Sequence, residues 1–302
     1  MERHVRADLP VIERRRKSPL GKRAAPYLLA APASLWLLVF FLVPLVTMLS
    51  LSVQTCDPFT LACRLTWHVG IFGQTLSQFH VQLVRSIVYG GVATAIDLAV
   101  GFPFAYWVAF YGGSKKNFFL LMLLLPFFVS FVIRTLAWRF ILSDQGIVLG
   151  TLKSLHLLPQ NSHVLATGTA VVAGIAYNFL PFTALPLYVA LERIDPRVLE
   201  AARDLYANRT TVFVKVVVPL AVPGIFAAFL LTFVPAVGDF VNASILGGTS
   251  NTMIGNVIQN TFLINSDYPT ASALSAILMV AMLIGIFAYG KLLGSRTIEE
   301  YI

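Results

Sequence analysis

Long apolar runs separated by short polar segments form the main pattern of this chain. Six runs lie at 27–53, 83–110, 117–141, 164–190, 213–238 and 271–293. Each is long enough to cross a hydrocarbon layer of about 30 Å as a helix. A spanning segment must satisfy its own backbone hydrogen bonds, which a helix does. The pattern therefore predicts an all-α integral membrane protein with six transmembrane helices.

The polar segment between the fourth and fifth runs itself has the pattern of a helix. Asp195-Pro196 is a start signal, because Asp caps the free amides of the first turn and Pro fits where no amide partner is needed. A helix is therefore predicted to begin at Pro196. Its apolar arc consists of Val198, Ala201, Ala202, Leu205 and Tyr206, and its polar arc of Arg197, Glu200, Arg203 and Asp204. Such a helix either lies at the lipid headgroups or docks onto a partner.

Composition and charge agree with a membrane protein. The chain has 302 residues, of which 57% are hydrophobic and 12% charged, unlike an ordinary soluble domain. Its net charge of +8 does not indicate a nucleic-acid partner, because Lys and Arg lie between the apolar runs and are not interleaved with aromatic residues. Membrane lipids are the expected surroundings.

The distribution of basic residues predicts the orientation. With the N-terminus inside, 17 of the 22 Lys and Arg residues lie in cytoplasmic segments. Both termini are then cytoplasmic, with a basic tail at 1–26, a six-span domain at 27–302 and a cytoplasmic loop at about 191–215. The first apolar run is too long for a signal peptide and lacks a cleavage site, so we expect it to stay in the protein.

The predicted outer loops, 54–82, 142–163 and 239–270, are rich in small and polar residues that could meet a periplasmic partner. Cys56 and Cys63 both lie in the first of them. On the exported side they either close a small disulfide or remain two free thiols.

No catalytic constellation is present in the sequence. Gly112-Gly113-Ser114-Lys115 lacks the spacing and strand context of a phosphate-binding loop. The five His residues are scattered without other ligands at metal-binding spacing, so no metal site is predicted. The chain alone is not expected to be an enzyme.

Charged residues inside the apolar runs are candidates for function, because an ionisable group at bilayer depth is rarely kept facing lipid. Asp97 lies halfway along the second run and Arg134 in the third. They either line a polar translocation path or pair with each other or with helix ends. Arg139 beside Trp138 has the position of a snorkelling anchor. Asn178 is more typical of an interhelical hydrogen-bond donor than of a ligand contact.

Asp239 opens an outer segment whose only charges are acidic, since no Lys or Arg occurs between Lys215 and Lys291. Phe233 and Phe240 lie close in sequence, and Tyr268 follows in the same segment. A carboxylate with aromatic rings suits an ammonium group through ionic and cation–π contact. The alternative is that each ring is an ordinary core residue.

Glu200-Ala201-Ala202, followed by Pro219-Leu220 and Pro223-Gly224-Ile225, resembles the EAA loop of ABC importer permeases. The resemblance implies a coupling helix that docks into a cytoplasmic ATPase. Its contact residues would be Glu200, Ala201, Ala202, Arg203, Asp204, Leu205 and Tyr206. That family usually has Gly at the position of Tyr206, to end the helix in a left-handed conformation. We therefore predict that the helix continues to Ala207 and that Asn208 makes the exit.

Two further stretches resemble spermidine/putrescine permeases. One runs from Leu125-Pro126-Phe127 to Arg134 and Trp138, and the other comprises Pro235-Ala236-Val237-Gly238-Asp239-Phe240 with the Gly and Asn motifs after it. The family commonly has Glu where this chain has Asp239. The resemblance implies the first of two permease subunits of a bacterial inner-membrane importer. Its partners would be a second permease, an ATPase dimer that binds ATP and Mg²⁺, and a periplasmic binding protein; this chain would hold no cofactor.

The resulting hypothesis is an ABC permease that forms half of the path for a small cation, most simply a polyamine. The candidate path residues are Asp97, Arg134, Trp138, Asn178, Phe233, Asp239 and Phe240. One alternative is an ABC permease for another amine, an opine-like compound or an oxyanion. Another is an ion-coupled secondary transporter, with Asp97 and Asp239 as coupling carboxylates. A membrane scaffold without transport activity is a third.

Overall fold

The computed structural model describes residues 27, 30–56, 63–157 and 159–298. The predicted basic tail, residues 1–26, lies outside the described residues. The chain divides into two units, 1–48 and 49–302. Most of the helix Ala30–Leu51, which includes the π-helical turn η1 (Leu38–Leu42) and α2 (Val43–Leu51), belongs to the first unit. Its apolar side chains are largely exposed, as expected of a helix that faces lipid.

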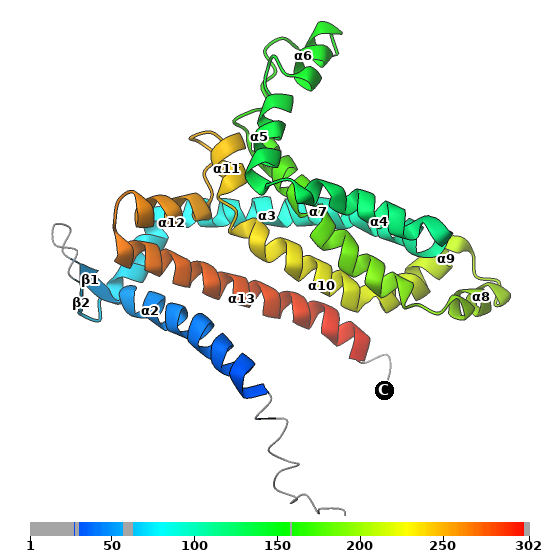
Figure 1. The fold of residues 1–302 in the computed structure, drawn as a ribbon, viewed down its shortest axis with the longest axis horizontal. Coiled ribbons are helices and arrows are strands. Elements are labelled where there is room, and N and C mark those ends of the chain that lie inside the picture. Colours follow the sequence, from blue (N-terminus) through cyan, green and yellow to red (C-terminus); the bar gives the residue numbers. More distant parts are fainter. Residues whose placement is uncertain (1–26, 28–29, 57–62, 158, 299–302) are drawn as a thin grey trace, which may run out of the picture. The chain divides into compact units, whose positions relative to one another are not determined.

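Four long helices organise the second unit (Figure 1). They are α3 (Gly70–Tyr111), α7 (Gly168–Glu192), α10 (Val218–Val237) and α13 (Tyr268–Ile298). Helix α7 packs on α3 and α10, which also pack on each other, and α13 packs on α3, α10 and α12. The shorter elements are β1 (Gln54–Cys56), β2 (Cys63–Leu65), η2 (Gly113–Lys115), α4 (Lys116–Leu124), η3 (Leu125–Phe128), α5 (Phe131–Ile141), α6 (Ile147–Ser154), α8 (Pro196–Asp204), α9 (Arg209–Val212), η4 (Phe213–Val217), α11 (Val241–Leu246) and α12 (Ile254–Leu263).

The helical fold class is confirmed, but the third apolar run is not one straight helix. Five described helices are long and apolar enough to cross a membrane, and a sixth would be a pair, Gly113–Phe128 and Phe131–Ile141, bent by 90°. The chain is extended at Val129 and Ser130 between the two parts. Pro126 lies just before the break and has no amide to donate, which weakens the helix there. The six-span count and the orientation remain predictions.

Helix α3 begins at Gly70, well before the apolar run predicted at 83–110, so the helix is longer than the predicted span. At about 1.5 Å per residue its 42 residues extend roughly 63 Å, twice the hydrocarbon thickness. The extra turns carry polar residues such as Gln74, Ser77 and His80, which end the hydrophobic run without ending the helix. The predicted outer loops are likewise partly helical, because they hold the first turns of α3 as well as α6, α11 and α12.

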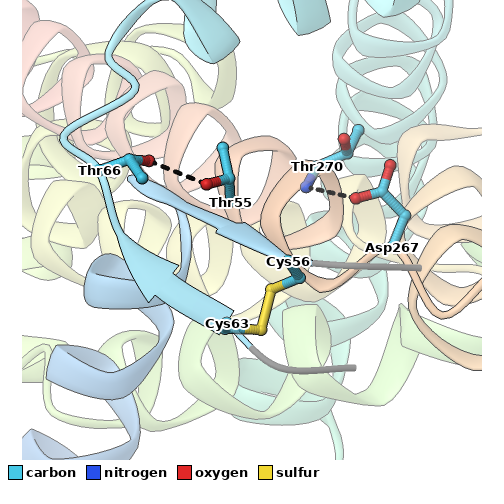
Figure 2. Close-up of a disulfide and its surroundings, with 6 residues drawn as sticks. All are labelled: Thr55, Cys56, Cys63, Thr66, Asp267 and Thr270. Carbon is cyan, nitrogen blue, oxygen red and sulfur yellow. Dashed lines mark hydrogen bonds between the residues drawn. A yellow bond between two sulfur atoms is a disulfide. The ribbon is translucent and has the colours of Figure 1, made fainter. Parts of the chain in front are cut away.

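A disulfide closes the hairpin that precedes α3. Strands β1 and β2 are antiparallel, and Cys56 is directly opposite Cys63. The two residues are disulfide-bonded, and Thr55 donates a hydrogen bond of 3.2 Å to Thr66 (Figure 2). Of the two alternatives for these cysteines, the structure contains the disulfide. Such a bond is typical of an oxidising compartment.

Helix α7 contributes to two core clusters. The Ile175 cluster includes Ala93 of α3, and the Leu187 cluster includes Ala105 of the same helix. Close approach of α3 to α10 depends on Gly90, where an added Cβ would lie 3.0 Å from the backbone nitrogen of Val237. Small residues at helix contacts of this kind are typical of membrane bundles.

A charged cluster braces the segment that contains α6. Lys153 Nζ donates to Asp144 at 3.0 Å, and the ring of His163 lies 2.7 Å from the other carboxylate oxygen. The hydrogen bond from Lys153 and then that from His163 lower the pKa of Asp144. Both hydrogen bonds stabilise the ionised carboxylate. Their contribution to the free energy of unfolding is therefore complete above the ordinary pKa of Asp and is lost as the pH falls through the lowered pKa of Asp144.

We therefore expect Asp144→Asn to loosen α6. Amide hydrogen exchange in α6 should be faster than in the wild type at neutral pH, by less than about tenfold because solvent screens the half-exposed carboxylate. The difference should vanish at acid pH, where Asp144 of the wild type is protonated and, like the Asn of the variant, carries no charge. Equal exchange at neutral pH would contradict a bracing role for Asp144.

Candidate functional site

Helix α8 begins where the sequence predicts. It spans Pro196–Asp204, and the side chain of Asp195 accepts a hydrogen bond of 2.9 Å from the amide of Arg197. The capping carboxylate satisfies one of the free amides of the first turn. The predicted start at Pro196 is therefore confirmed.

The predicted exit of this helix is wrong. Helix α8 ends at Asp204, and Tyr206 itself adopts the left-handed conformation, with φ 60°. Its amide donates to Arg203 O at 2.9 Å, and the amide of Ala207 donates to Ala202 O at 3.2 Å. This is the paired pattern that usually ends a helix at Gly. These hydrogen bonds offset a strain of about 1–2 kcal/mol in a non-glycine residue.

Asn208 starts a new helix instead of ending the old one. Its side chain accepts from the amide of Thr211 at 2.7 Å, so it caps α9. Helix α9 continues through η4 into α10, and Arg209–Val237 forms one long apolar helical segment. Only Leu205, Tyr206 and Ala207 lie between the end of α8 and this cap, so the chain must reverse at Tyr206.

The apolar arc of α8 is split between two environments. Leu199 is buried, and it packs with Ala202 in the Leu187 cluster. Ala201 is exposed, and Leu205 and Tyr206, just past the helix end, are 82% and 99% exposed. Leu199 lies at the edge of the predicted arc, so the sequence did not identify it as the anchor. Leu199 and Ala202 thus pack on the bundle, whereas Leu205 and Tyr206 form an exposed apolar tip.

Exposed polar residues surround this tip. Glu200, Arg203 and Asp204 are all exposed. A groove of about 350 Å³ lies beside the helix start, lined by Ala190, Arg193, Ile194, Asp195, Val198, Leu220 and Pro223. Gly224 lets α10 approach α7 closely here, since an added Cβ would lie 2.2 Å from the Cβ of Ala190. Gly224 of the EAA-like loop therefore allows α10 to pack against α7, and Pro223 lines the groove beside α8.

A buried polar network connects α5, α7 and α11. Asn178 Nδ2 donates to Thr135 Oγ1 and to Asn242 Oδ1, both at 3.1 Å, and Asn242 in turn donates to Asp239. Asn178, Thr135 and Asn242 are all fully buried. The interpretation of Asn178 as an interhelical donor is confirmed. The sequence pattern did not single out Thr135 or Asn242, because one hydroxyl and one loop amide carry no periodic signal.

Asp239 holds the start of α11. Its carboxylate accepts from the amides of Val241 at 2.8 Å and of Asn242 at 3.1 Å, as well as from the Asn242 side chain. It is 6% exposed. Burial raises the pKa of Asp239, while the hydrogen bonds from Asn242 and Val241 oppose that rise. Hydrogen bonds within the chain thus reach both carboxylate oxygens of Asp239.

Two of the aromatic rings predicted near Asp239 pack against other rings. Phe233 stacks on Phe229 at 4.9 Å, in a cluster with Val237 and Met282. Tyr268 packs against Phe262 at 5.0 Å. Only Phe240 is next to Asp239 in the chain, and it is 41% exposed. The rings of Phe233 and Tyr268 are therefore core or helix contacts.

Asp97 and Arg134 are both buried, and the interpretation that they pair with each other is wrong. In the described part of the chain neither residue forms an ion pair, and Asp97 Oδ2 has no hydrogen-bond partner. The guanidinium of Arg134 lies 4.4 Å from the centre of the Phe127 ring. Trp138 contacts Tyr177 edge-on at 5.3 Å, and Arg139 is exposed, as an anchor would be.

The long apolar helices, five of which are long enough to cross a membrane among the described residues, define a multi-pass helical membrane protein. Residues 98–297 match the family of binding-protein-dependent transport system inner membrane components, and the chain belongs to this family. It is a multi-pass inner-membrane protein and the transmembrane subunit of an ABC importer.

Curated relatives support this assignment at the level of sequence. The chain is 36% identical to the spermidine/putrescine transport system permease protein PotB of Haemophilus influenzae, over 84% of this chain and 89% of the relative. It is 31% identical to PotB of Escherichia coli, over 88% and 96%. The inner membrane ABC transporter permease protein YdcU of E. coli is 30% identical, over 89% and 90%.

Solved structures show the same fold. A bacterial ABC transporter involved in the import of the acidic polysaccharide alginate has a chain that aligns with a TM-score of 0.67, at 19% identity over 92% of this chain and 98% of that one. The MetNI methionine ABC transporter, in an inward-facing conformation, aligns with a TM-score of 0.57, at 15% identity over 72% and 95%. At these identities the likeness concerns the fold alone.

Proposed function

We propose that this chain is one of two permease subunits of an ATP-driven polyamine importer. The observation that carries the proposal is its 31–36% identity, over 84–88% of its length, to permeases named for spermidine and putrescine. A second support is Asp239, a buried acid that anchors the polar network in an outer segment without Lys or Arg. A carboxylate there favours cations over anions.

The proposed coupling contact is α8 with its exposed tip. Leu205 and Tyr206 would enter an apolar groove of a cytoplasmic ATPase, while Glu200 and Arg203 make polar contacts around them. Leu199 of α8 packs in the same cluster as Leu187 of α7 and Val217, which directly precedes α10. A displacement of α8 would therefore be passed to α7 and the start of α10. ATP-driven closure of the ATPase would in this way move the spans between inward-open and outward-open forms.

The chain is proposed to be non-catalytic by itself, with ATP and Mg²⁺ bound by the ATPase dimer. A periplasmic binding protein would deliver the substrate to the outer segments, and the second permease would complete the path. The domain division into a basic tail at 1–26 and a permease domain at 27–302 is part of the same proposal. An ion-coupled mechanism based on Asp97 and Asp239 is disfavoured by the family membership.

A second candidate substrate class is an oxyanion, which the buried cation Arg134 favours because it forms no ion pair with the described residues. Uptake of labelled spermidine by cells that express the complete transporter separates the two. We expect excess putrescine to compete and excess sulfate or phosphate to have no effect. Transport of a labelled oxyanion, without spermidine uptake, would reject the polyamine proposal and leave the ABC class standing.

A further inference from the structure

The loop between α11 and α12, residues 247–253, is fastened to helix α3. Three side chains of α3 make the hydrogen bonds: Arg85 Nη1 donates to Thr252 O at 3.0 Å, Tyr89 Oη donates to Asn251 Oδ1 at 3.0 Å, and Ser86 Oγ accepts from the amide of Ile254 at 2.7 Å. The tip of the loop, residues 248–250, is exposed. The loop therefore presents an accessible tip on a hydrogen-bonded base.

Asn251 connects three parts of the chain at this base. Its Nδ2 donates to Ala166 O at 2.8 Å and to Gly247 O at 3.1 Å, while its Oδ1 accepts from Tyr89. Ala166 lies just before the start of α7, and its own amide donates to Leu246 O at 2.8 Å. One amide side chain thus ties together α3, the segment before α7 and the end of α11.

Ala166 is held at this junction in a strained conformation. Its φ is 63°, in the left-handed region that Gly248, with φ 61°, adopts freely. A non-glycine residue persists there only where its surroundings hold it, and such strain is concentrated at elements that switch. The hydrogen bonds to Leu246 and Asn251 hold Ala166 in place. Lifting the loop would release this strain, which lowers the cost of opening.

The loop is continuous with both elements that hold the turn at Asp239. On one side, α11 contributes Asn242, whose amide and side chain both donate to Asp239. On the other side, α12 carries Asn256, whose Nδ2 donates to the carbonyl of Phe240 at 2.7 Å. A movement of the loop would therefore be passed to the Asp239 turn from both ends.

We propose that residues 247–253 form a latch that holds the outer segment in the observed arrangement and opens during transport. Tyr89 and Asn251 are its positioning residues, because their hydrogen bond fixes the loop to α3. The closed latch restrains the helix movements that accompany ATP hydrolysis. The proposal rests on the proposed function, which supplies the ATPase and the binding protein. Docking of the binding protein over the tip, 248–250, would favour the open latch, since a ligand shifts an equilibrium toward the state that it binds more tightly.

The first test measures ATP hydrolysis by the complete transporter without its binding protein. A net hydrogen bond shifts a two-state equilibrium by about two- to tenfold. We therefore expect Tyr89→Phe and Asn251→Ala each to raise this basal rate at least about twofold, and the binding protein to stimulate the variants less than the wild type. A purely structural role would lower the rate. Tyr268→Phe, in the same predicted outer segment, is the matched control; it keeps the ring contact with Phe262 and should leave the basal rate unchanged.

A second variant displaces the Tyr89 hydroxyl without removing any group, which keeps the test informative if Asn251→Ala fails to assemble. At Gly168, an added Cβ would lie 2.7 Å from Cζ of Tyr89 and closer still to its hydroxyl, so the ring must move away. We expect Gly168→Ala to raise basal hydrolysis as Tyr89→Phe does. The double variant should show no further rise, because both changes break the same hydrogen bond.

Two results would count against these proposals in different ways. Wild-type basal rates in Tyr89→Phe and Gly168→Ala, with normal stimulation by the binding protein, would overturn the latch and leave the proposed function standing. A wild-type complex whose hydrolysis does not respond to its binding protein would contradict the proposed function itself.

Discussion

Leu205→Asp is expected to separate the transporter from its ATPase. Leu205 is 82% exposed at the tip beyond α8, where the free chain gives it no packing partner to lose. Burying a Leu side chain in a partner's groove contributes about 2 kcal/mol, which corresponds to roughly 30-fold in affinity, and a buried carboxylate costs more. We therefore expect at least about tenfold less ATPase to co-purify and substrate-stimulated ATP hydrolysis to be lost.

The control for this prediction is the same substitution at the other side of the predicted topology. Leu155, which follows α6, is 61% exposed. Leu155→Asp should leave the co-purified ATPase unchanged, because Leu155 lies in a predicted outer segment. Normal ATPase recovery and hydrolysis with Leu205→Asp would show that the tip is not the coupling contact.

Asp239→Asn is expected to lower polyamine uptake by about tenfold or more. The carboxylate accepts three hydrogen bonds from Val241 and Asn242, and an amide would turn a donor toward one of them. Hydrogen bonds to a charged group contribute about 1.5–3 kcal/mol each, and 1.4 kcal/mol corresponds to a factor of ten. The substitution also removes the buried acid on which the preference for a cation depends.

Asp267→Asn is the matched control in the same outer segment. Asp267 is exposed, and its side chain accepts from the amide of Thr270 at 3.2 Å at the start of α13. Since Asn caps a helix about as well as Asp, uptake should be unchanged. Membrane abundance of both variants is measured alongside uptake. Unchanged spermidine uptake by Asp239→Asn, at normal abundance, would remove the reason for assigning a cation to this segment.

Local signals in the sequence were enough for part of the candidate coupling site. The Asp195-Pro196 pair predicts the start of α8 because capping involves residues adjacent in the chain. The exit at Tyr206 was not predictable in the same way. It depends on two backbone hydrogen bonds to Arg203 and Ala202 and on the following cap at Asn208, which together hold a non-glycine residue in a left-handed conformation.

Long-range features set the limit of prediction for the transport path. Thr135 and Asn242 are separated by 107 positions, yet they share one buried network with Asn178. Hydropathy locates the helices that carry Thr135 and Asn178, but it does not locate α11 or the 90° break that brings α5 beside α11. Hydropathy also cannot show that Asp97 and Arg134 form no ion pair with each other, because it carries no information on the distance between side chains of different helices. The buried charges were identified as unusual, whereas their partners were not.

Transport by the purified complex in proteoliposomes tests the central claim most directly. The complex of this chain with its second permease and ATPase is reconstituted with ATP and Mg²⁺ on the ATPase side, and the binding protein and labelled spermidine on the other. The account predicts accumulation that requires ATP hydrolysis and the binding protein and that is unaffected by collapse of ion gradients. Accumulation that continues without ATP and stops when an ion gradient is collapsed would contradict it.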